Sequence, residues 1–321
     1  MIDWLNYRDG TLFAEGVSLR AIAERFGTPT YVYSRSAIAG AFAEFASAAA
    51  GRKALICYAL KANSNLAVIE LLARAGAGFD IVSEGELQRV LAAGGDAGRV
   101  VFSGVGKGAG EIRAALRAGV RCFNVESRSE LQRLSDIASA LGRRAPISLR
   151  VNPDVDAGTH PYISTGLREN KFGIAHDEAV DVYRFAAALP GIEIAGIDCH
   201  IGSQITEIAP FLAALERLLE LIRTLRDAGI RLSHLDLGGG LGISYDAEQP
   251  PERRAMLAAI FARIDEDPLA RELEILFEFG RSIVGNAGLL LTRVEYLKHN
   301  GAKRFAIIDA AMNDLMRPAL Y

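Results

Sequence analysis

Short apolar runs rich in β-branched residues alternate with longer amphipathic stretches from residue 54 onward. The amphipathic stretches carry Ala, Leu, Glu and Arg at helical spacing, and several end in Gly, as helices commonly do. The apolar runs predict strands at 54–60, 79–82, 100–103, 121–125, 147–151, 194–199, 234–237 and 274–279. This alternation of strands and helices predicts an α/β fold with parallel strands.

The number of strand–helix units favours one architecture within that class. Eight units in about 230 residues match a (β/α)8 barrel of the TIM type, which usually needs about 250 residues. A doubly wound parallel sheet is the structural alternative, because it is built from the same alternation.

The two ends of the chain depart from this alternation. TPTYVYS at 28–34 predicts a strand before the first barrel strand, and GLLLTRVEYLKH and KRFAIIDAAM after residue 287 predict two more without a helix between them. We therefore expect a barrel over 35–286, an N-terminal segment 1–34 that contributes to a β-rich domain, and the start of that domain at 287–321. The ending MRPALY lacks the polar tail that usually closes a domain, so we expect a truncated chain with an incomplete β-domain.

Composition and charge exclude several classes of protein. Hydrophobic residues make up 50% of the 321 positions, and 36 Lys plus Arg nearly balance 39 Asp plus Glu. This argues against disorder and against a nucleic-acid or membrane partner. No apolar stretch is long enough to span a bilayer and the N-terminus lacks a signal-peptide pattern, so we expect a cytoplasmic protein. Cys57, Cys122 and Cys199 are too dispersed for a disulfide framework or a metal site, which predicts buried thiols.

Polar residues or glycines close every predicted barrel strand. A single residue of this kind is ordinarily a helix cap, but in a barrel the carboxyl ends of all strands meet at one face, where active sites lie. The recurrence at eight strands therefore favours a functional site at that face. The residues are Lys61, Asp80, Ser83, Ser103, Asn124, Glu126, Arg150, Asn152, His200, Ser203, Gly238, Gly239, Gly240, Glu278, Gly280 and Arg281.

Lys61 and the glycines of LDLGGGLG suggest the chemistry of that site. A lysine that closes an apolar strand is desolvated, which lowers its pKa and frees the neutral amine for Schiff-base formation. The alternative is a lysine whose head group reaches solvent. Consecutive glycines let backbone N–H groups approach an anion, and barrel phosphate sites lie after strands seven and eight. Together these features suggest pyridoxal 5'-phosphate (PLP).

Other motifs do not define a site. SGVGKGAG at 103–110 has neither dinucleotide-binding nor P-loop spacing, the histidines lack metal-ligand spacing, and no GxSxG motif is present. The long segment 153–175 carries His160, Tyr162, Arg168 and Lys171. It is either a lid that sets specificity or a solvated insertion.

A set of motifs resembles the diaminopimelate decarboxylase family across nearly the whole chain. These motifs are YALKAN, FDIVSEGEL, RVNPDV, HPYISTG followed by KFGI, HIGSQ, LDLGGGLGI, GRSIVGNAG and MRPALY. The resemblance implies an alanine racemase-like fold, PLP as cofactor, and decarboxylation of meso-2,6-diaminopimelate to L-lysine. It also implies a homodimer with the active site at its interface.

The resemblance assigns roles to individual residues. Lys61 matches the Schiff-base lysine, His200 the residue stacked on the cofactor ring, and Glu278 the carboxylate at the ring nitrogen. Asp80 matches a neighbour of the cofactor. The phosphate contacts would come from Ser203, Gly239, Gly240, Phe279, Gly280 and Arg281. Substrate contacts would come from Arg281, Arg317 and Tyr321, since guanidinium groups hold carboxylates bidentately.

Two departures from the family pattern affect these expectations. The family's EPGR is EFGR here, so Phe279 stands where a proline normally fixes the backbone of the phosphate loop. The family also continues beyond the position of Tyr321 with a cysteine–glutamate pair and a further tyrosine that complete the site. We therefore expect cofactor binding without appreciable turnover, and unpaired strands that promote association. Alternatives are an ornithine or arginine decarboxylase, disfavoured by HPYISTG and MRPALY, and a non-catalytic PLP-binding protein.

Overall fold

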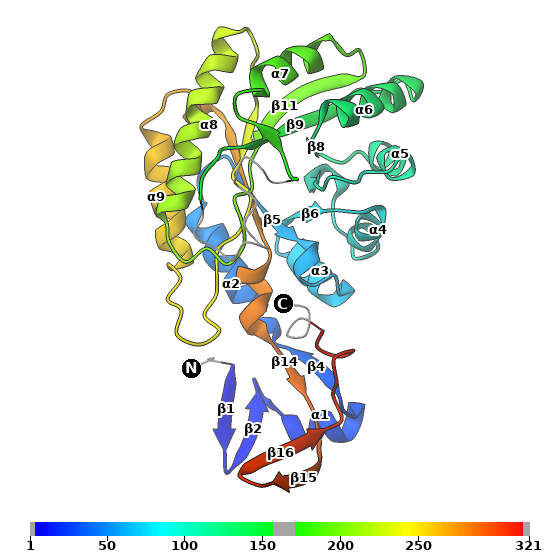
Figure 1. Cartoon of the computed structure of the whole chain (residues 1–321), viewed down its shortest axis with the longest axis vertical. Coiled ribbons are helices and arrows are strands. Elements are labelled where there is room, and N and C mark those ends of the chain that lie inside the picture. The colour runs from blue at the N-terminus through cyan, green and yellow to red at the C-terminus, as the bar shows by residue number, and fades with distance from the viewer. Residues whose placement is uncertain (1–3, 157–170, 317–321) are drawn as a thin grey trace. The chain divides into compact units, whose positions relative to one another are not determined.

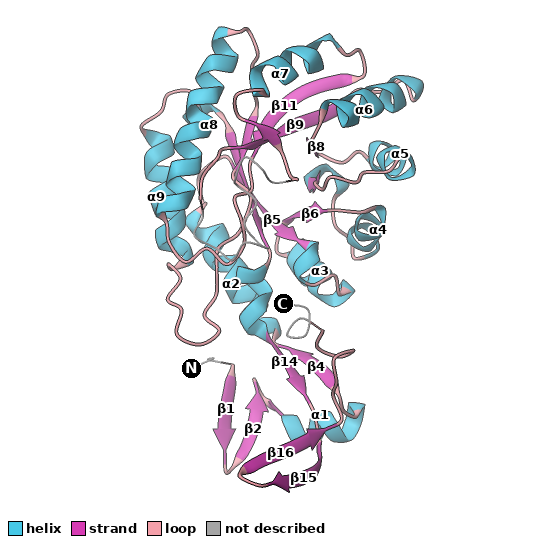
Figure 2. Ribbon diagram, viewed as in Figure 1, coloured by secondary structure: helices cyan, strands magenta, loops and turns pink. Residues whose placement is uncertain are grey.

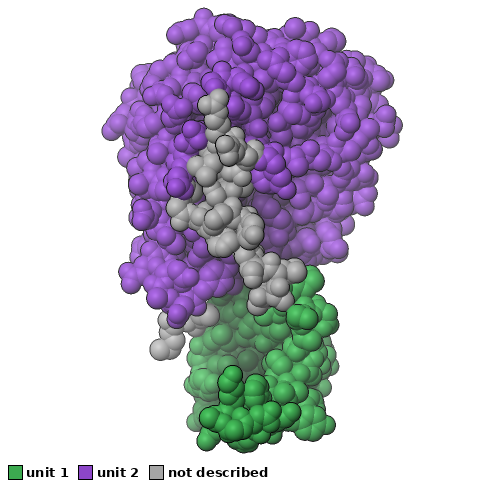
Figure 3. Space-filling model, viewed as in Figure 1, with its two compact units in different colours: residues 1–38, 286–321 green, residues 39–285 purple. Residues whose placement is uncertain are grey.

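The computed structural model describes residues 4–156 and 171–316 of the chain. It contains two compact units, of which unit 1 is Met1–Ile38 with Asn286–Tyr321 and unit 2 is Ala39–Gly285 (Figure 3). Each unit has a hydrophobic core of its own.

Unit 2 is a closed barrel of eight parallel strands (Figures 1 and 2). Each strand pairs with the next along the chain, and β13 pairs with β5 to close the ring. The predicted barrel is thus confirmed, and a doubly wound sheet is excluded because the first and last strands pair. The strands are β5 (Ala54–Ala59), β6 (Gly78–Ile81), β7 (Val100–Phe102), β8 (Cys122–Val125), β9 (Ala145–Asn152), β11 (Ile192–Asp198), β12 (His234–Asp236) and β13 (Glu274–Phe279), with the short β10 (Ile174–Ala175) beside β9.

Helices lie outside the ring of strands (Figure 2). Several begin at a polar side chain that accepts a backbone N–H: Asn65 before α3, Ser83 before α4 and Ser127 before α6. Ser83 is therefore a helix cap rather than a site residue. The helices are α2 (Arg35–Ala48), α3 (Leu66–Arg74), α4 (Glu84–Ala92), α5 (Ala109–Ala118), α6 (Arg128–Ala140), α7 (Ala179–Ala188), α8 (Ala209–Asp227), α9 (Arg253–Asp265) and the single turn α10 (Arg281–Val284), with 3-10 turns η1 (Leu60–Ala62), η2 (Ala97–Arg99), η3 (Ala270–Glu272) and η4 (Gly285–Ala287).

Side chains alternate between the barrel interior and the helical layer, as the twofold period of a strand requires. On β13, Leu276 belongs to an interior cluster with apolar side chains of β5, β7 and β8. Phe277 and Phe279 instead stack against each other and contact Phe261 of α9 and Phe45 of α2. All three cysteines are buried, as predicted.

A polar contact crosses the barrel interior beneath the strand ends. The hydroxyl of Ser148 on β9 lies 2.6 Å from Nε2 of His234 on β12. A Cβ atom at Gly196, on the strand between them, would lie 2.2 Å from that nitrogen, so only glycine leaves room for the ring. Burial lowers the pKa of His234 to about 4, which keeps the imidazole neutral.

Unit 1 combines segments from both ends of the chain. β1 (Leu5–Arg8), β2 (Thr11–Ala14) and β3 (Val17–Ser18) form an antiparallel sheet that precedes α1 (Leu19–Phe26), and none of these elements was predicted from the sequence. The predicted strand in 28–34 is β4 (Thr30–Tyr33), which pairs with β14 (Gly288–Leu291). Buried Trp4, Ala14 and Leu19 form the core of this unit.

The C-terminal segment has three strands rather than the two predicted. After β14 the chain bends at Thr292 and Arg293, where Asp309 accepts hydrogen bonds from the Thr292 hydroxyl (2.6 Å) and the Arg293 N–H (2.9 Å). β15 (Val294–Asn300) and β16 (Lys303–Ile308) then pair with each other, and every residue of both is exposed. Across the described parts of the chain, none of the helices is both long and apolar enough to span a membrane.

Candidate active site

The polar residues expected at the strand ends lie at the carboxyl end of the barrel. Asp80, Asn124, Arg150, Asn152 and Glu278 lie in the last three residues of their own strands, and the others lie in the segments that follow a strand. Lys61 is in the middle of η1, immediately after β5. Ser103, Glu126, His200 and Gly238 follow β7, β8, β11 and β12.

Lys61 forms an ion pair with Asp80 of the neighbouring strand. The Lys61 Nζ lies 2.5 Å from Asp80 Oδ2, and the lysine side chain is 49% exposed whereas that of Asp80 is fully buried. The expectation of a lowered lysine pKa was wrong. Desolvation acts in that direction, but the charges of Asp80 and Glu278 outweigh it and raise the pKa of Lys61 above its usual value. Without a carbonyl partner, Lys61 is therefore a stable ammonium.

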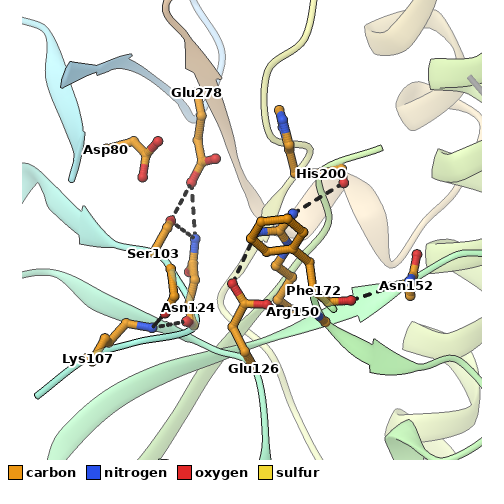
Figure 4. Close-up of polar contacts among 12 residues, drawn as sticks. Asp80, Ser103, Lys107, Asn124, Glu126, Arg150, Asn152, Phe172, His200 and Glu278 are labelled. Carbon is orange, nitrogen blue, oxygen red and sulfur yellow. Dashed lines mark hydrogen bonds and ion pairs between the residues drawn. The ribbon is translucent and has the colours of Figure 1, made fainter. Parts of the chain in front are cut away.

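Glu278 projects from β13 toward two neutral donors (Figure 4). Its Oε1 accepts a hydrogen bond from the Asn124 side-chain amide at 3.1 Å and one from the Ser103 hydroxyl at 3.3 Å. The pKa of Glu278 is well above its ordinary value because the group is desolvated and because Asp80 and other carboxylates lie nearby.

Two buried carboxyl groups that the sequence analysis did not select lie beside Glu278. Asp198 ends β11 and Asp236 ends β12, and carboxylate oxygens of these two residues and Glu278 lie within 4.8 Å of one another. Desolvation raises the pKa of Asp236 to about 7 and that of Asp198 well above its usual value. The available signal was an aspartate at the inward-facing end of an otherwise apolar strand, at IAGID and HLD.

His200 is held by the glycine loop after β12. Its Nδ1 accepts a hydrogen bond from the Gly239 N–H at 3.2 Å, so the ring proton lies on Nε2. Desolvation, together with the positive charges of Arg150 and Lys61, lowers the pKa of His200 well below its ordinary value. The imidazole is therefore neutral.

The three glycines after β12 pack against the backbone of neighbouring strand ends. A Cβ atom at Gly239 would lie 2.0 Å from the carbonyl oxygen of Glu278, and one at Gly240 would lie 2.3 Å from that of Gly202. Gly240 also has a φ of +105°, which side chains rarely adopt. A side chain at these positions would displace the loop. Gly238, Gly239 and Gly240 therefore form a closely packed stretch of backbone, here called the glycine cradle.

Arg281 lies beside this cradle. Its guanidinium donates to the Ser203 hydroxyl at 3.1 Å and to the hydroxyl of Tyr245, a residue that the sequence analysis did not select. The Phe279 ring is completely buried and stacks on Phe45 with 4.0 Å between ring centroids. Its side chain thus points into the helical layer rather than into the site. A Cβ atom at Gly280 would lie 3.0 Å from the Cβ of Ala62, which is a tight contact.

A further set of contacts ties the strand end of β9 to the segment after residue 170. Glu126 accepts from Arg150 at 3.1 Å and from the Gly173 N–H at 2.6 Å, and the Asn152 side chain donates to the Phe172 carbonyl at 3.4 Å. Several predicted residues lie outside the described part of the chain. They are the substrate residues Arg317 and Tyr321, and His160, Tyr162 and Arg168 of the long loop.

The donor set fits PLP. Asp80 Oδ1, Asp198 Oδ1 and Asp236 Oδ2 are buried without a hydrogen-bond partner, so this end of the barrel has carboxyl oxygens left to accept from a cationic ligand such as a protonated ring nitrogen. The glycine cradle offers backbone to a phosphate. Lys61 supplies a primary amine whose side chain is accessible.

The fold and this donor set define a class of enzyme, which comparison with known families confirms. Residues 35–285 match the family described as "Pyridoxal-dependent decarboxylase, pyridoxal binding domain". The chain is a PLP-dependent decarboxylase barrel, and PLP is its cofactor.

Individual relatives specify the branch of that family. A diaminopimelate decarboxylase of Pseudomonas aeruginosa is 63% identical over 320 residues, which cover 100% of this chain and 76% of the relative. A solved diaminopimelate decarboxylase of Helicobacter pylori in complex with L-lysine has a TM-score of 0.90 at 45% identity, covering 94% of this chain and 75% of that one. The chain belongs to the diaminopimelate decarboxylase family.

A decarboxylase with a different substrate is more distant. The solved lysine decarboxylase of Selenomonas ruminantium has a TM-score of 0.83 at 26% identity, covering 94% of this chain and 76% of that one. The barrel is therefore shared between the two activities, while the sequence of this chain is much more similar to the diaminopimelate enzymes.

Proposed function

We propose that this chain carries the PLP-binding barrel of an enzyme that decarboxylates meso-2,6-diaminopimelate to L-lysine and carbon dioxide. The observation that supports it most directly is the meeting of Lys61, Asp80 and Glu278 at one end of the barrel, in a chain that is 63% identical to a diaminopimelate decarboxylase. The reaction is the formation of lysine, so the enzyme would serve lysine biosynthesis.

Lys61 has the position and access required of the residue that holds the cofactor. PLP, when bound, accepts the electron pair released as the α-carboxylate of an amino acid leaves as carbon dioxide. Asp80 holds the amine of Lys61 in place and favours its protonated form. Lys61 would hold the carbonyl group of the cofactor after its ammonium has lost a proton. Because the side chain of Asp80 is fully buried, the surrounding barrel residues fix its position.

Glu278 is the residue proposed to pair with the ring nitrogen. A carboxylate there favours a protonated nitrogen, which strengthens the electron-accepting character of the ring. Asn124 and Ser103 occupy one of its oxygens, so the carboxyl group is oriented before any ligand enters. Asp236 and Asp198 place two more buried carboxyl groups beside it.

The remaining predicted residues are assigned to binding. The neutral ring of His200 would stack on the cofactor, and Ser203, Gly239, Gly240, Gly280 and the backbone of Phe279 and Arg281 would hold its phosphate. The Arg281 side chain, with Arg317 and Tyr321, would bind substrate carboxylates. Three further predictions carry over: domain boundaries at 34/35 and 286/287, a homodimer with the site at its interface, and a cytoplasmic location.

Exchange of Glu278 tests the proposed chemistry. In an otherwise complete enzyme, Glu278→Gln keeps the shape of the side chain but removes the charge. Cofactor binding should therefore persist while turnover falls more than tenfold, about 1.4 kcal/mol of barrier for each factor of ten. Carbon dioxide release from meso-diaminopimelate measures turnover, and absorbance of the bound cofactor measures loading. An unchanged turnover number would assign Glu278 a structural role.

Substrate specificity is tested separately with a version of the enzyme extended through the complete β-domain. Carbon dioxide release from meso-diaminopimelate should exceed release from L-lysine, L-ornithine and L-arginine, because the guanidinium groups assigned to substrate binding, Arg281 and Arg317, suit a second carboxylate on the substrate. Preferential release from one of the three single-carboxylate substrates would overturn the proposed activity while leaving the cofactor assignment intact.

A further inference from the structure

SGVGKGAG, the glycine-rich segment with no recognisable phosphate-binding spacing, contains a lysine whose place in the structure is unusual. The side chain of Lys107 is 1% exposed, and its Nζ donates to the carbonyl oxygens of Gly104 (2.7 Å) and Asn124 (2.6 Å) and to Glu130 Oε1 (2.8 Å). An ammonium group has three N–H donors, so all of them are used inside the protein. Lys107 therefore has no donor left for a ligand.

These three acceptors connect two adjacent strand ends. Gly104 follows β7 directly after Ser103, and Asn124 lies on β8. Glu130, in the first turn of α6, also accepts from the backbone N–H of Glu126 at 2.9 Å. The Lys107–Glu130 pair thus fixes the backbone at the carboxyl ends of β7 and β8 relative to each other.

The side chains that leave these two strand ends converge on Glu278 (Figure 4). The Asn124 amide donates both to Ser103 Oγ and to Glu278 Oε1, each at 3.1 Å, and Ser103 Oγ lies 3.3 Å from the same carboxyl oxygen. Asn124 is fully buried, and Ser103 and Glu278 are 6% and 5% exposed. Water therefore does not compete for these hydrogen bonds.

We propose that Asn124 and Ser103, held in place by the buried Lys107, are positioning residues for Glu278. The two donors hold Oε1 and orient the carboxyl group, and they stabilise its ionised form, which the cofactor requires. They act against the surroundings of Glu278, since Asp80, Asp198 and Asp236 disfavour its charge while Lys61 favours it. The role of Glu278 at the ring nitrogen is part of the proposed function, but the arrangement around Glu278 is present without a ligand.

The ionisation of Glu278 in the PLP-free chain tests this role. The 13C signal of the Glu278 carboxyl, assigned by its loss in Glu278→Gln, is followed against pH in the wild type and in Asn124→Leu, which has similar volume but no donor. Loss of a donor to the carboxylate should raise the midpoint by about one pH unit. Ser103→Ala should raise it by less, and provides the measurement if Asn124→Leu does not fold.

A control and a second readout separate positioning from general damage. Ser148→Ala removes a buried hydroxyl of the same barrel that has no contact with Glu278, and should leave the midpoint unchanged. The Kd for PLP, from absorbance titration, should rise about tenfold in Asn124→Leu and stay at the wild-type value in Ser148→Ala. The proposal would be overturned if the midpoint and the Kd for PLP in Asn124→Leu and Ser103→Ala equalled those of the control Ser148→Ala. This result does not depend on which amino acid the enzyme decarboxylates.

Discussion

Two lysines at the carboxyl end of the same barrel differ in their burial and in the number of their hydrogen-bond partners. Lys61, after β5, is half exposed and makes one ion pair, with an aspartate whose second oxygen has no partner. Lys107, after β7, is buried and gives all three of its protons to protein acceptors. A lysine whose donors are all used stabilises the fold, whereas one with an accessible side chain and a single partner is available for chemistry.

The largest expected effect concerns covalent capture of the cofactor. Borohydride reduction of the PLP-loaded protein should fix the cofactor on the peptide that contains Lys61, and Lys61→Ala should abolish the adduct. Mass spectrometry of the digested protein identifies the labelled peptide. Label on the Lys107 peptide, or an adduct that survives in Lys61→Ala, would reverse the contrast between the two lysines.

Removal of the other lysine should affect stability instead. Lys107→Met leaves Glu130 buried without its cation, and breaking such a pair costs about 3–5 kcal/mol of unfolding free energy. Urea unfolding measures the loss. Adding Glu130→Gln should recover part of it, since the uncompensated charge is then gone. Stability within error of the wild type would mean that the buried pair contributes little.

A smaller effect is expected from the partner of Lys61. The raised pKa of Lys61 means that the neutral amine becomes available only as the pH rises toward and beyond 10.5, the ordinary lysine value. Asp80→Asn removes the nearest negative charge, so the pKa of Lys61 falls and adduct formation with PLP should begin at lower pH, by about one unit. Stopped-flow absorbance across pH 7–10 measures the shift. An unchanged profile would show that Glu278 alone sets the lysine pKa.

The smallest effect serves as a comparison with an exposed ion pair. Arg52 and Asp265 meet on the surface of unit 2 at 2.6 Å, with 38% and 46% of their side chains exposed. Arg52→Met should change the unfolding free energy by no more than about 1 kcal/mol, because solvent screens such pairs. Equal losses for Arg52→Met and Lys107→Met would show that burial does not determine how much an ion pair contributes to stability.

The barrel was predictable because each of its strands and helices has a recognisable pattern within a short stretch of sequence. Each strand is a short apolar run and each helix has an amphipathic period, so the eight strands were placed to within about two residues of their observed ends. The sheet β1–β3 was missed because its strands are two to four residues long and only partly buried. Short, half-exposed strands leave no alternation to detect.

The site was predictable only in part, for a related reason. Lys61, Glu278 and the glycines stand out as unusual residues at strand ends. The direction in which the pKa of Lys61 shifts, however, depends on Asp80 and Glu278, which only the folded barrel brings close to it. Asp236 was overlooked, although it lies just before the glycines of LDLGGGLG, because only the fold brings its carboxyl group beside those of Glu278 and Asp198. The task of Lys107 likewise depends on acceptors from three separate segments.

The pairing of β13 with β5 has a consequence for how the enzyme folds. Glu278 lies opposite Cys57 in that register, so the last strand of the barrel must reach the first before Glu278 and Lys61 can share a site. Contacts of such large sequence separation form late and slowly in folding. PLP therefore has its complete site only on a closed ring, and by binding the native state selectively it shifts the folding equilibrium toward closure. Cofactor supply during synthesis should accordingly raise the yield of folded enzyme.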